Sequence, residues 1–424
     1  MQNNEFRPNQ TLEYLFLDLN SYFASVEQQE NPALIGKPVA IVPAMTDATC
    51  AIAASYEAKA YGIRTGTKIY EAKKLCPDLV CILARHDVYV KYHHRIFNEL
   101  ERHIHITKIC SVDEAACLLM RQDRDPTAAI ELAQTIKQAL RENIGDAIKC
   151  SIGIAPNMFL AKTASNMQKP DGLTLLMPNQ LQASLFRLKL SDLTGIGHNI
   201  ERRLNSAGIY SVENLWNITP KHARKIWGSV SGEKFWYKLR GYSIPDQPTK
   251  KSVIGHSRML DPAHRPPAEA YQITRHLTNK ASARLRRYEM YTSCLSLSLR
   301  TVSGQRWSRS VSFSDTQDTF KLISHLERLW NLMAEQLNPR DVLKTSVSLT
   351  QLKTQQLVTL DLFEDYTPEK RTLQNKRLSS AIDTLNQTYG AQTITIGACL
   401  KTSAGHVGTK IAFNRIPEEG EFKE

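Results

Sequence analysis

The sequence predicts a protein of the mixed α+β class with more than one domain. Over roughly the first 175 residues, apolar runs of strand length alternate with stretches of helical periodicity, as in an α/β or α+β core. A second mixed region, residues 252–355, combines alternating strands with two amphipathic helices near 268–287 and 317–337. The composition changes between these regions, near residues 178–192.

The N-terminal region begins with a predicted buried strand. Residues 14–19 form an apolar run interrupted only by Asp18. A short helix is expected over residues 21–29, because a proline follows it, and a strand over residues 38–42. Residues 53–61 are predicted to form a helix that ends at the glycine after it.

Further along, apolar residues at three- and four-residue spacing predict a helix over residues 127–144, followed by a half-buried strand over 148–154. Another helical segment is expected from Leu215 to Trp236. A stretch containing two prolines, residues 241–251, is expected to be a linker. The last 60 or so residues have weak patterning and an acidic end, and are expected to be an extension with partial order.

The composition is that of a soluble globular protein, with 42% hydrophobic and 23% charged residues. No apolar stretch approaches the roughly 20 residues that span a bilayer, and the N-terminus does not resemble a secretory signal. The eight cysteines include no CxxC pair, which argues against a zinc site or a disulfide framework. A cytoplasmic enzyme with no membrane partner is therefore expected.

The net charge of +12 is unevenly distributed. Residues 250–309 contain twelve Lys and Arg against three acids. Such a segment repels itself unless a polyanion is present, and nucleic acid is the obvious polyanionic partner.

Three acidic residues interrupt apolar stretches. Asp18 lies in the first strand, and Asp113 and Glu114 lie together in a second apolar stretch, residues 109–115. Ionised carboxylates at such positions are costly unless a cation meets them, and oxygen-rich sites suit Mg²⁺ or Mn²⁺. The alternative is that Asp18 and Asp113 cap turns at strand ends. If the three acids share one site, a turn or bend must lie at residues 113–114, because strand alternation sends neighbours to opposite faces.

Other candidates are less specific. Phe23 lies at the start of the helix after Asp18, either beside a bound substrate or in the core. Tyr56 and Lys59 share a helical face and could bind phosphate. Lys162 and Lys169 bracket another helix, and a lysine at the turn beyond it could either meet a polyphosphate or face water.

A small-residue hairpin occurs at Gly195-Ile196-Gly197, preceded by a leucine and followed by Arg202 and Arg203. This pattern is typical of a helix-hairpin-helix, in which backbone N–H groups grip DNA phosphates without reading the sequence.

Taken together, these segments resemble a Y-family translesion DNA polymerase from about residue 14 to residue 355. The matching blocks follow the expected order: residues 18–27, 56–63, 111–115, 151–155, 161–165, 169–172, 195–197 and 251–258. The resemblance implies a right-hand architecture of the α+β class. Its parts are a palm (1–28 and 89–177), small fingers (29–88), a helix-hairpin-helix thumb (178–243), a linker (244–251), a separate α/β little-finger domain (252–355) and a C-terminal extension (356–424).

The resemblance also implies roles for individual residues. Asp18, Asp113 and Glu114 would hold two Mg²⁺ with help from the carbonyl of Leu19, Mn²⁺ being a substitute. Phe23 would be a steric gate against the ribose 2′-hydroxyl. The incoming deoxynucleoside triphosphate would be bound by Tyr56, Lys59 and Lys169; lysine replaces the more usual arginine at position 59 and lacks its bidentate fork. Primer–template DNA would be bound by Gly195, Gly197, Arg202, Arg203, Lys251, Arg258, Arg284 and Arg286.

Two features bear on the branch of the family. Asn20 stands where many relatives have a second acid, which is typical of the UmuC-like catalytic subunits of polymerase V, with the polymerase IV type as the near alternative. The resemblance to the UmuC-like subunits implies a UmuD-like dimer and RecA as possible protein partners. Residues 359–363 resemble a sliding-clamp motif, in which Leu360, Leu362 and Phe363 would fill the hydrophobic pocket although Thr359 replaces glutamine.

The expected function is therefore error-prone, template-directed DNA synthesis past damaged bases. One alternative is a catalytically inactive relative that binds DNA as a scaffold, but such relatives typically lack the metal-binding acids. Another is a helix-hairpin-helix nuclease or repair protein, which would not account for Tyr56, Lys59 and Lys169.

Overall fold

The computed structural model describes residues 7–245, 250–357, 368–390, 393–394 and 396. These residues form two compact units, the first containing residues 7–245 and the second the described residues from 250 onwards. Within the described residues, no helix has the length and apolar character needed to cross a membrane.

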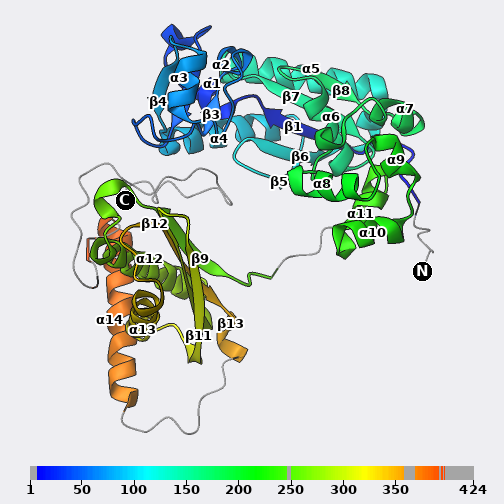
Figure 1. Cartoon of the computed structure of the whole chain (residues 1–424). Coiled ribbons are helices and arrows are strands. Elements are labelled where there is room, and N and C mark those ends of the chain that lie inside the picture. Colours follow the sequence, from blue (N-terminus) through cyan, green and yellow to red (C-terminus); the bar gives the residue numbers. More distant parts are fainter. Residues whose placement is uncertain (1–6, 246–249, 358–367, 391–392, 395, 397–424) are drawn as a thin grey trace. The chain divides into compact units, whose positions relative to one another are not determined.

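A five-stranded sheet with the order β5-β6-β1-β7-β8 forms the centre of the first unit (Figure 1). Its strands are β1 (Tyr14–Leu19), β5 (Ile106–Ile109), β6 (Glu114–Leu118), β7 (Cys150–Ala155) and β8 (Leu173–Leu175). Strand β1 is buried on both faces. Leu15 and Leu17 belong to one apolar core, and Phe16 belongs to a second core with α6 and the helical region after residue 180. This explains why β1 is apolar almost throughout.

Four helices pack around this sheet and carry much of the two cores. They are α1 (Tyr22–Glu30), α4 (His86–Glu101), α5 (Pro126–Asn143) and α6 (Met158–Met167). Helix α5 begins at Pro126, where the carboxylate of Asp125 accepts hydrogen bonds from the N–H groups of the first turn.

A smaller sheet with the order β3-β2-β4 lies in the region expected to form the fingers. Its strands are β2 (Val39–Val42), β3 (Ala53–Ala54) and β4 (Val80–Leu83), and it is accompanied by α2 (Tyr56–Ala60) and α3 (Ile69–Leu75). The helix predicted over 53–61 is therefore wrong in its first turn. Residues 53–54 pair with β2, and Ser55 caps a helix that begins at Tyr56.

The last part of the first unit is helical: α7 (Leu181–Leu185), α8 (His198–Ser206), α9 (Val212–Asn217), α10 (Pro220–Trp227) and α11 (Val230–Leu239). The single helical segment expected from Leu215 to Trp236 is thus broken twice. Thr219 caps α10 before Pro220, and Gly228 ends it with a φ of +70°.

The second unit has a four-stranded sheet in the order β11-β10-β12-β9, with two long helices on one face (Figure 1). Its elements are β9 (Ile254–Met259), α12 (Pro267–Arg287), β10 (Met290–Thr301), β11 (Arg306–Thr316), α13 (Thr319–Leu337), β12 (Val342–Thr350) and the short β13 (Lys353–Thr354). Short 3₁₀ helices occupy 32–34, 121–124, 178–180, 190–192, 262–264 and 355–357.

A further helix, α14 (Pro368–Tyr389), lies within the extension that was expected to be partly ordered. It is fixed to the second unit by polar contacts. Asp383 accepts two hydrogen bonds from Arg286, at 2.6 and 2.9 Å, and Asn375 donates to Asp318 at 3.1 Å. The residues of the sliding-clamp motif, 359–363, lie outside the described residues.

Candidate active site and nucleic-acid interface

The three acids meet at one end of the central strands. Asp18, near the end of β1, is paired in register with Glu114, the first residue of β6. The N–H of Leu19 donates to the carbonyl of Asp113 at 2.9 Å. The expected turn is present between β5 and β6, where the N–H groups of Cys110 and Ser111 both donate to the carbonyl of Glu114. Asp18 and Glu114, 96 positions apart in the chain, are thus adjacent in the sheet.

Burial in this site disfavours the ionised form of the Asp18 and Asp113 carboxylates. Burial is the main reason that the pKa of Asp18 is raised to about 6. Lys169 opposes this rise, and the neighbouring Glu114 and Asp113 carboxylates add to it. Burial likewise raises the pKa of Asp113, although the hydroxyl of Ser111 donates to it at 2.5 Å. A bound cation would relieve both carboxylates.

Two lysines partly neutralise the acids. The Nζ of Lys169 lies 2.7 Å from Oδ1 of Asp18, and the Nζ of Lys162 lies 2.6 Å from Oε2 of Glu114. Lys169 was predicted to contact a triphosphate, and here it contacts the carboxylate at the centre of the site. Lys162 was given no role among the predicted site residues; it lies within α6, seven residues before Lys169.

These contacts determine how the acids are presented. Among the described residues, no three His, Cys, Asp or Glu side chains are placed to hold a metal ion together. The oxygens of Asp18, Asp113 and Glu114 are instead directed to Lys169, Ser111 and Lys162. The chemistry of the set still fits a hard divalent cation, because it offers several carboxylate oxygens in a buried site whose negative charge is incompletely compensated.

Asn20 has a structural role in this arrangement. Its side chain is buried, donates to the hydroxyl of Ser151 at 3.0 Å and accepts from the N–H of Asp171 at 2.7 Å. It therefore ties the end of β1 to β7 and to the turn that follows Lys169. The amide lies within hydrogen-bond distance of the Ser151 hydroxyl through both Nδ2 and Oδ1, at 3.0 and 3.2 Å, whereas an aspartate could only accept from it.

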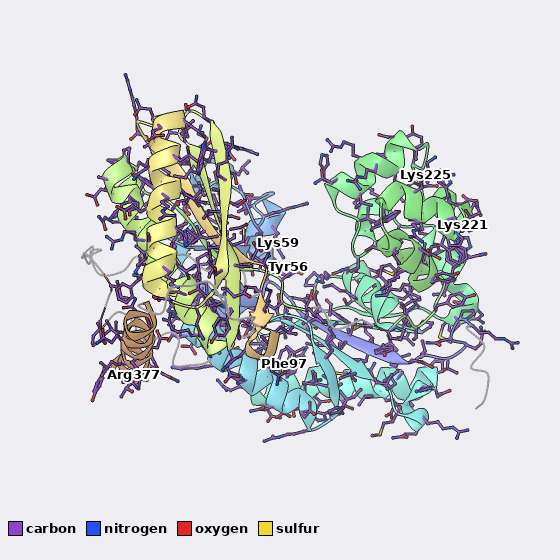
Figure 2. The ribbon with its side chains drawn as sticks, turned by 90° about the horizontal axis from the view of Figure 1, so that it is seen from below. Tyr56, Lys59, Phe97, Lys221, Lys225 and Arg377 are labelled. Atoms are coloured by element: carbon purple, nitrogen blue, oxygen red, sulfur yellow. The ribbon has the colours of Figure 1, made fainter. Side chains whose placement is uncertain are left out.

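The predicted triphosphate-binding residues lie on α2 beside the acids. The ammonium of Lys59 lies 4.2 Å from the centre of the Tyr56 ring (Figure 2) and donates to the hydroxyl of Ser21 at 2.7 Å. Burial lowers the pKa of Lys59, and the positive charges of Lys169 and Arg64 lower it further. Burial raises the pKa of Tyr56 to about 12, with a contribution from the Asp18 carboxylate.

Lys59, Lys169 and Arg64 thus form a positive region next to the carboxylates. Sequence reasoning missed Arg64. The signal for it was its position just after the matching block of residues 56–63.

Phe23, the predicted steric gate, is the second residue of α1 and is 8% exposed. Its ring stacks on that of Tyr89, with centroids 4.4 Å apart and an angle of 15° between the planes. It is therefore a core residue, and it lies on the helix that follows the strand carrying Asp18.

The helix-hairpin-helix glycines lie in the turn before α8. Gly195 has a φ of +90°, a conformation that favours glycine, and Gly197 is the N-cap of α8 with open space where a Cβ would stand. Arg202 and Arg203 are both exposed, and Arg203 also donates to the carbonyl of Trp227 at 3.0 Å and so helps to hold α10. Lys221 and Lys225 project from α10 (Figure 2).

The sheet of the second unit has one face lined by hydroxyls and cations, opposite its helices. The strand register places Ser296 and Ser298 of β10 opposite serines of both neighbouring strands, which makes two rows of serines on this face. A basic row formed by Arg306, Arg300 and Lys344 follows them. The serines in the rows are Ser310, Ser296 and Ser348, and Ser308, Ser298, Ser346 and Ser257. Apolar and serine residues alternate along these strands. The apolar residues were used to predict the strands, whereas the serines on the opposite face were missed.

The DNA-binding residues predicted in the second unit do not lie together on this face. Arg258 pairs in register with the buried Thr345 and so points to the helix side of β9. Arg286 is 12% exposed and is bound to Asp383. Lys251 and Arg284 both lie against the ring of Tyr288. Burial opposes ionisation of Tyr288, but hydrogen bonds from these two cations bring its pKa down to about 8.

Comparison with known proteins identifies relatives over most of the chain. Residues 17–166 match the impB/mucB/samB family, and residues 251–362 match the C-terminal domain of that family. A protein named DNA polymerase IV 1 from Bacillus subtilis is 30% identical over 91% of this chain and 92% of its own length. DNA polymerase IV from Moorella thermoacetica is 33% identical over 90% of this chain and 94% of its own.

Solved structures show the same fold. A Y-family DNA polymerase chimera of Dbh and Dpo4 aligns with a TM-score of 0.68 and 24% identity, covering 81% of this chain and 99% of the chimera. An insertion ternary complex of Dbh DNA polymerase aligns with a TM-score of 0.52, also at 24% identity. The names of the relatives favour the polymerase IV branch over the UmuC-like branch that Asn20 had suggested as nearest.

Proposed function

The chain belongs to the Y family of DNA polymerases, the impB/mucB/samB family, and we propose that it extends primers past damaged template bases by template-directed, error-prone nucleotidyl transfer. The observation that carries this proposal is the convergence of Asp18, Asp113 and Glu114 at the end of the central strands. The scaffold alternative has no support, because the relatives are named as polymerases and the acids are retained. We place the chain in the polymerase IV branch.

The three acids are the proposed ligands of two Mg²⁺ ions, assisted by the carbonyl of Leu19, with Mn²⁺ as a substitute. When bound, divalent metals supply activation of the primer 3′-hydroxyl and stabilisation of the pyrophosphate leaving group. The chain's own contribution is to hold the carboxylates ready. The register of β1 and β6 fixes Asp18 against Glu114, and the β5–β6 turn brings in Asp113.

Lys169, Lys59 and Tyr56 are the proposed ligands of the incoming deoxynucleoside triphosphate. The lowered pKa of Lys59 reflects its burial near other cations, and a polyphosphate would compensate that cluster of charge. Because Lys169 contacts Asp18 in the structure, it is placed to exchange the carboxylate for a phosphate as substrate and metal enter.

Phe23 is the proposed steric gate, in which the edge of the ring excludes a ribose 2′-hydroxyl. Two features support this role. The ring lies on the helix that leaves the strand carrying Asp18, and it is fixed by stacking on Tyr89.

Primer–template DNA is proposed to contact both units. In the first unit, the turn at Gly195 and Gly197 exposes backbone to phosphates, and Arg202 follows it. In the second unit, we assign the main contact to the serine and basic rows of the open sheet face rather than to Arg258 or Arg286. Hydroxyl donors and fixed cations on a flat surface suit a phosphate backbone and require no particular sequence.

The protein partners are a separate matter. Leu360, Leu362 and Phe363 remain the proposed contacts to a sliding clamp, on the motif alone. A UmuD-like dimer and RecA were implied by the UmuC comparison, and the function proposed here requires neither. The place of action is proposed to be the cytoplasm, where DNA and triphosphates are available.

A primer-extension assay tests the proposal. The wild-type chain should add deoxynucleotides to a labelled primer opposite an abasic or bulky template base when Mg²⁺ is present, and should stop when the metal is chelated. Asp113→Asn should abolish addition, whereas Asp78→Asn, an exposed acid of the same unit, should not. Failure of the wild type on both undamaged and damaged templates would favour the scaffold. DNA cleavage that needs no triphosphate would favour the nuclease.

A further inference from the structure

Tyr89 covers one face of the Phe23 ring. The two rings are nearly parallel with centroids 4.4 Å apart, and both side chains are buried, Tyr89 completely. The ring of His86 meets each of them edge-on, at 6.0 Å from Phe23 and 5.8 Å from Tyr89. The position of the Phe23 ring is therefore set by the position of Tyr89.

Tyr89 is held at both ends. Its hydroxyl donates to Oε1 of Glu27 at 2.8 Å, and its backbone carbonyl accepts a hydrogen bond from the hydroxyl of Tyr22 at 2.6 Å. Burial raises the pKa of Tyr89, so the hydroxyl remains a donor at physiological pH. A stacked ring whose far end is hydrogen-bonded to a carboxylate can neither slide nor tilt without losing that bond.

Glu27 is in turn held by Arg85. The carboxylate is 3% exposed and receives the guanidinium through Nε at 3.1 and 3.2 Å and through Nη2 at 2.5 Å. Phe23 and Glu27 are four residues apart on α1, as are Arg85 and Tyr89 at the start of α4. Each pair therefore lies on one face of its helix, and the two faces meet.

A buried charge is an expensive way to join two helices. The Arg85 side chain is 43% exposed, but the Glu27 carboxylate is removed from water. Apolar residues of similar volume usually give equal or greater stability than a charge buried in this way. Buried ionic groups have a clearer use in fixing one arrangement of their neighbours. Here the neighbour that is fixed is the ring that stacks on Phe23.

We propose that Glu27, Arg85 and Tyr89 form a gate support, a set of positioning residues that holds the Phe23 ring and so sets the discrimination between deoxyribonucleoside and ribonucleoside triphosphates. The inference rests on the steric-gate role proposed for Phe23. None of the three residues touches the substrate in this scheme. They act through the ring of Phe23, whose edge must stay in place to exclude one hydroxyl group.

The test compares kcat/KM for a deoxynucleotide and for the matching ribonucleotide. Tyr89→Phe removes only the hydroxyl, and Glu27→Gln removes only the charge. Each should lower the deoxy-to-ribo ratio by about 5- to 10-fold, as expected for a change of roughly 1 kcal/mol in relative barrier height. The change should appear as a higher kcat/KM for the ribonucleotide. Phe23→Ala should lower the ratio further.

A matched control is available one turn along α4. The hydroxyl of Tyr92 donates to Oε1 of Glu30 at 2.8 Å, so Tyr92→Phe removes the same kind of bond from the same two helices and leaves Glu27 untouched. This variant should keep the wild-type ratio. Thermal unfolding of each variant shows whether it is folded. If Glu27→Gln does not fold, the ratio measured for Tyr89→Phe tests the proposal.

The outcomes separate the two levels of the argument. A general loss of packing lowers activity on both sugars and cannot raise activity on the ribonucleotide. If Phe23→Ala collapses the ratio but Tyr89→Phe keeps it, the gate support is wrong and the proposed function stands. If Phe23→Ala leaves the ratio unchanged while primers are still extended, the gate role is wrong and the gate support fails with it.

Discussion

The charged side chains are clustered and partly buried in the first unit but spread over an exposed surface in the second. In the first unit, three carboxylates and two lysines are packed around the end of β1, where burial raises the pKa of Asp18 to about 6. In the second, Arg300, Arg306 and Lys344 lie in an exposed row beside serines. Chemistry at one atom needs a few charges fixed in a low-dielectric site, whereas retention of a long polyanion needs many weak contacts in water. Single substitutions should therefore act very differently in the two units.

The largest effect is expected from Glu114→Gln, which keeps the shape of the side chain and removes its charge. The catalytic rate should fall by about 10²- to 10³-fold or more, as for other single electrostatic groups at a reacting centre, while DNA affinity should remain nearly unchanged. Single-turnover nucleotide addition at saturating DNA measures the first, and a fluorescence titration measures the second. Glu131→Gln, an exposed acid on α5, is the control. An equal fall in DNA affinity would remove the distinction between the units.

The converse change replaces Arg300, Arg306 and Lys344 together by serine, which extends the neighbouring serine rows. DNA affinity should fall, and the slope of log Kd against log salt should decrease by roughly 2 to 3, because each phosphate contact contributes about 0.9. The rate at saturating DNA should be retained.

The control for this triple variant changes three cations on the helix side, Lys280, Lys321 and Arg328, to glutamine. It alters the net charge equally but should leave more of the salt slope intact. Equal slopes in the two triple variants would show that total charge, rather than the sheet face, governs DNA binding.

A smaller effect is expected at Arg286, which charge counting assigned to DNA. Because it is 12% exposed and bound to Asp383, Arg286→Gln and Asp383→Asn should each lower the stability of the second unit by about 1–2 kcal/mol, within the range for hydrogen bonds to charged groups. Arg286 also donates to the carbonyl of Gln317 and to the hydroxyl of Thr319, so the double variant should cost little more than Arg286→Gln alone. Denaturant unfolding measures this, and a DNA titration should show wild-type affinity for Asp383→Asn.

These cases show what the sequence could predict. The apolar run of β1 and the periodicity of α5 are local signals, and both elements appear close to their expected limits. The pairing of Asp18 with Glu114 is a matter of sheet register, which no local pattern contains, so it was reached through the family resemblance. Helix α14 was missed because polar contacts at Asn375 and Asp383, rather than an apolar stripe, fix it to its neighbours.

Two further differences have a physical cause. The short strand β3 was read as helix because its pairing with β2 is a contact between distant residues that overrides local preference. Arg258 and Arg286 were assigned to DNA because composition counts charges without showing which face of a strand or helix carries them. Alternation could have separated Arg258 from Arg300, since the first aligns with the buried Thr345 and the second with Lys344.

An effect of similar size, confined to the metal-free protein, is expected from Asp18. The pKa of Asp18 is raised above its usual value because the carboxylate is buried near Glu114 and Asp113. The folded state therefore keeps this proton longer than the unfolded chain does, so the contribution of Asp18 to stability is greatest below about pH 4 and is lost as the pH rises through about 6.

Asp18→Asn should remove this pH dependence. Relative to the wild type with chelator, the variant should gain stability between pH 4 and 6, on the order of 1–3 kcal/mol, and the gain should level off above that range. Excess Mg²⁺ should stabilise the wild type and not the variant, because a ligand that binds only the folded state adds stability. The difference in stability between variant and wild type should therefore shrink or change sign. A variant that is less stable than the metal-free wild type at pH 7 would mean that the contact with Lys169 outweighs the crowding of the acids. The active site would then be stable without a cation, in contrast to the site described above, where burial and neighbouring acids disfavour the ionised Asp18.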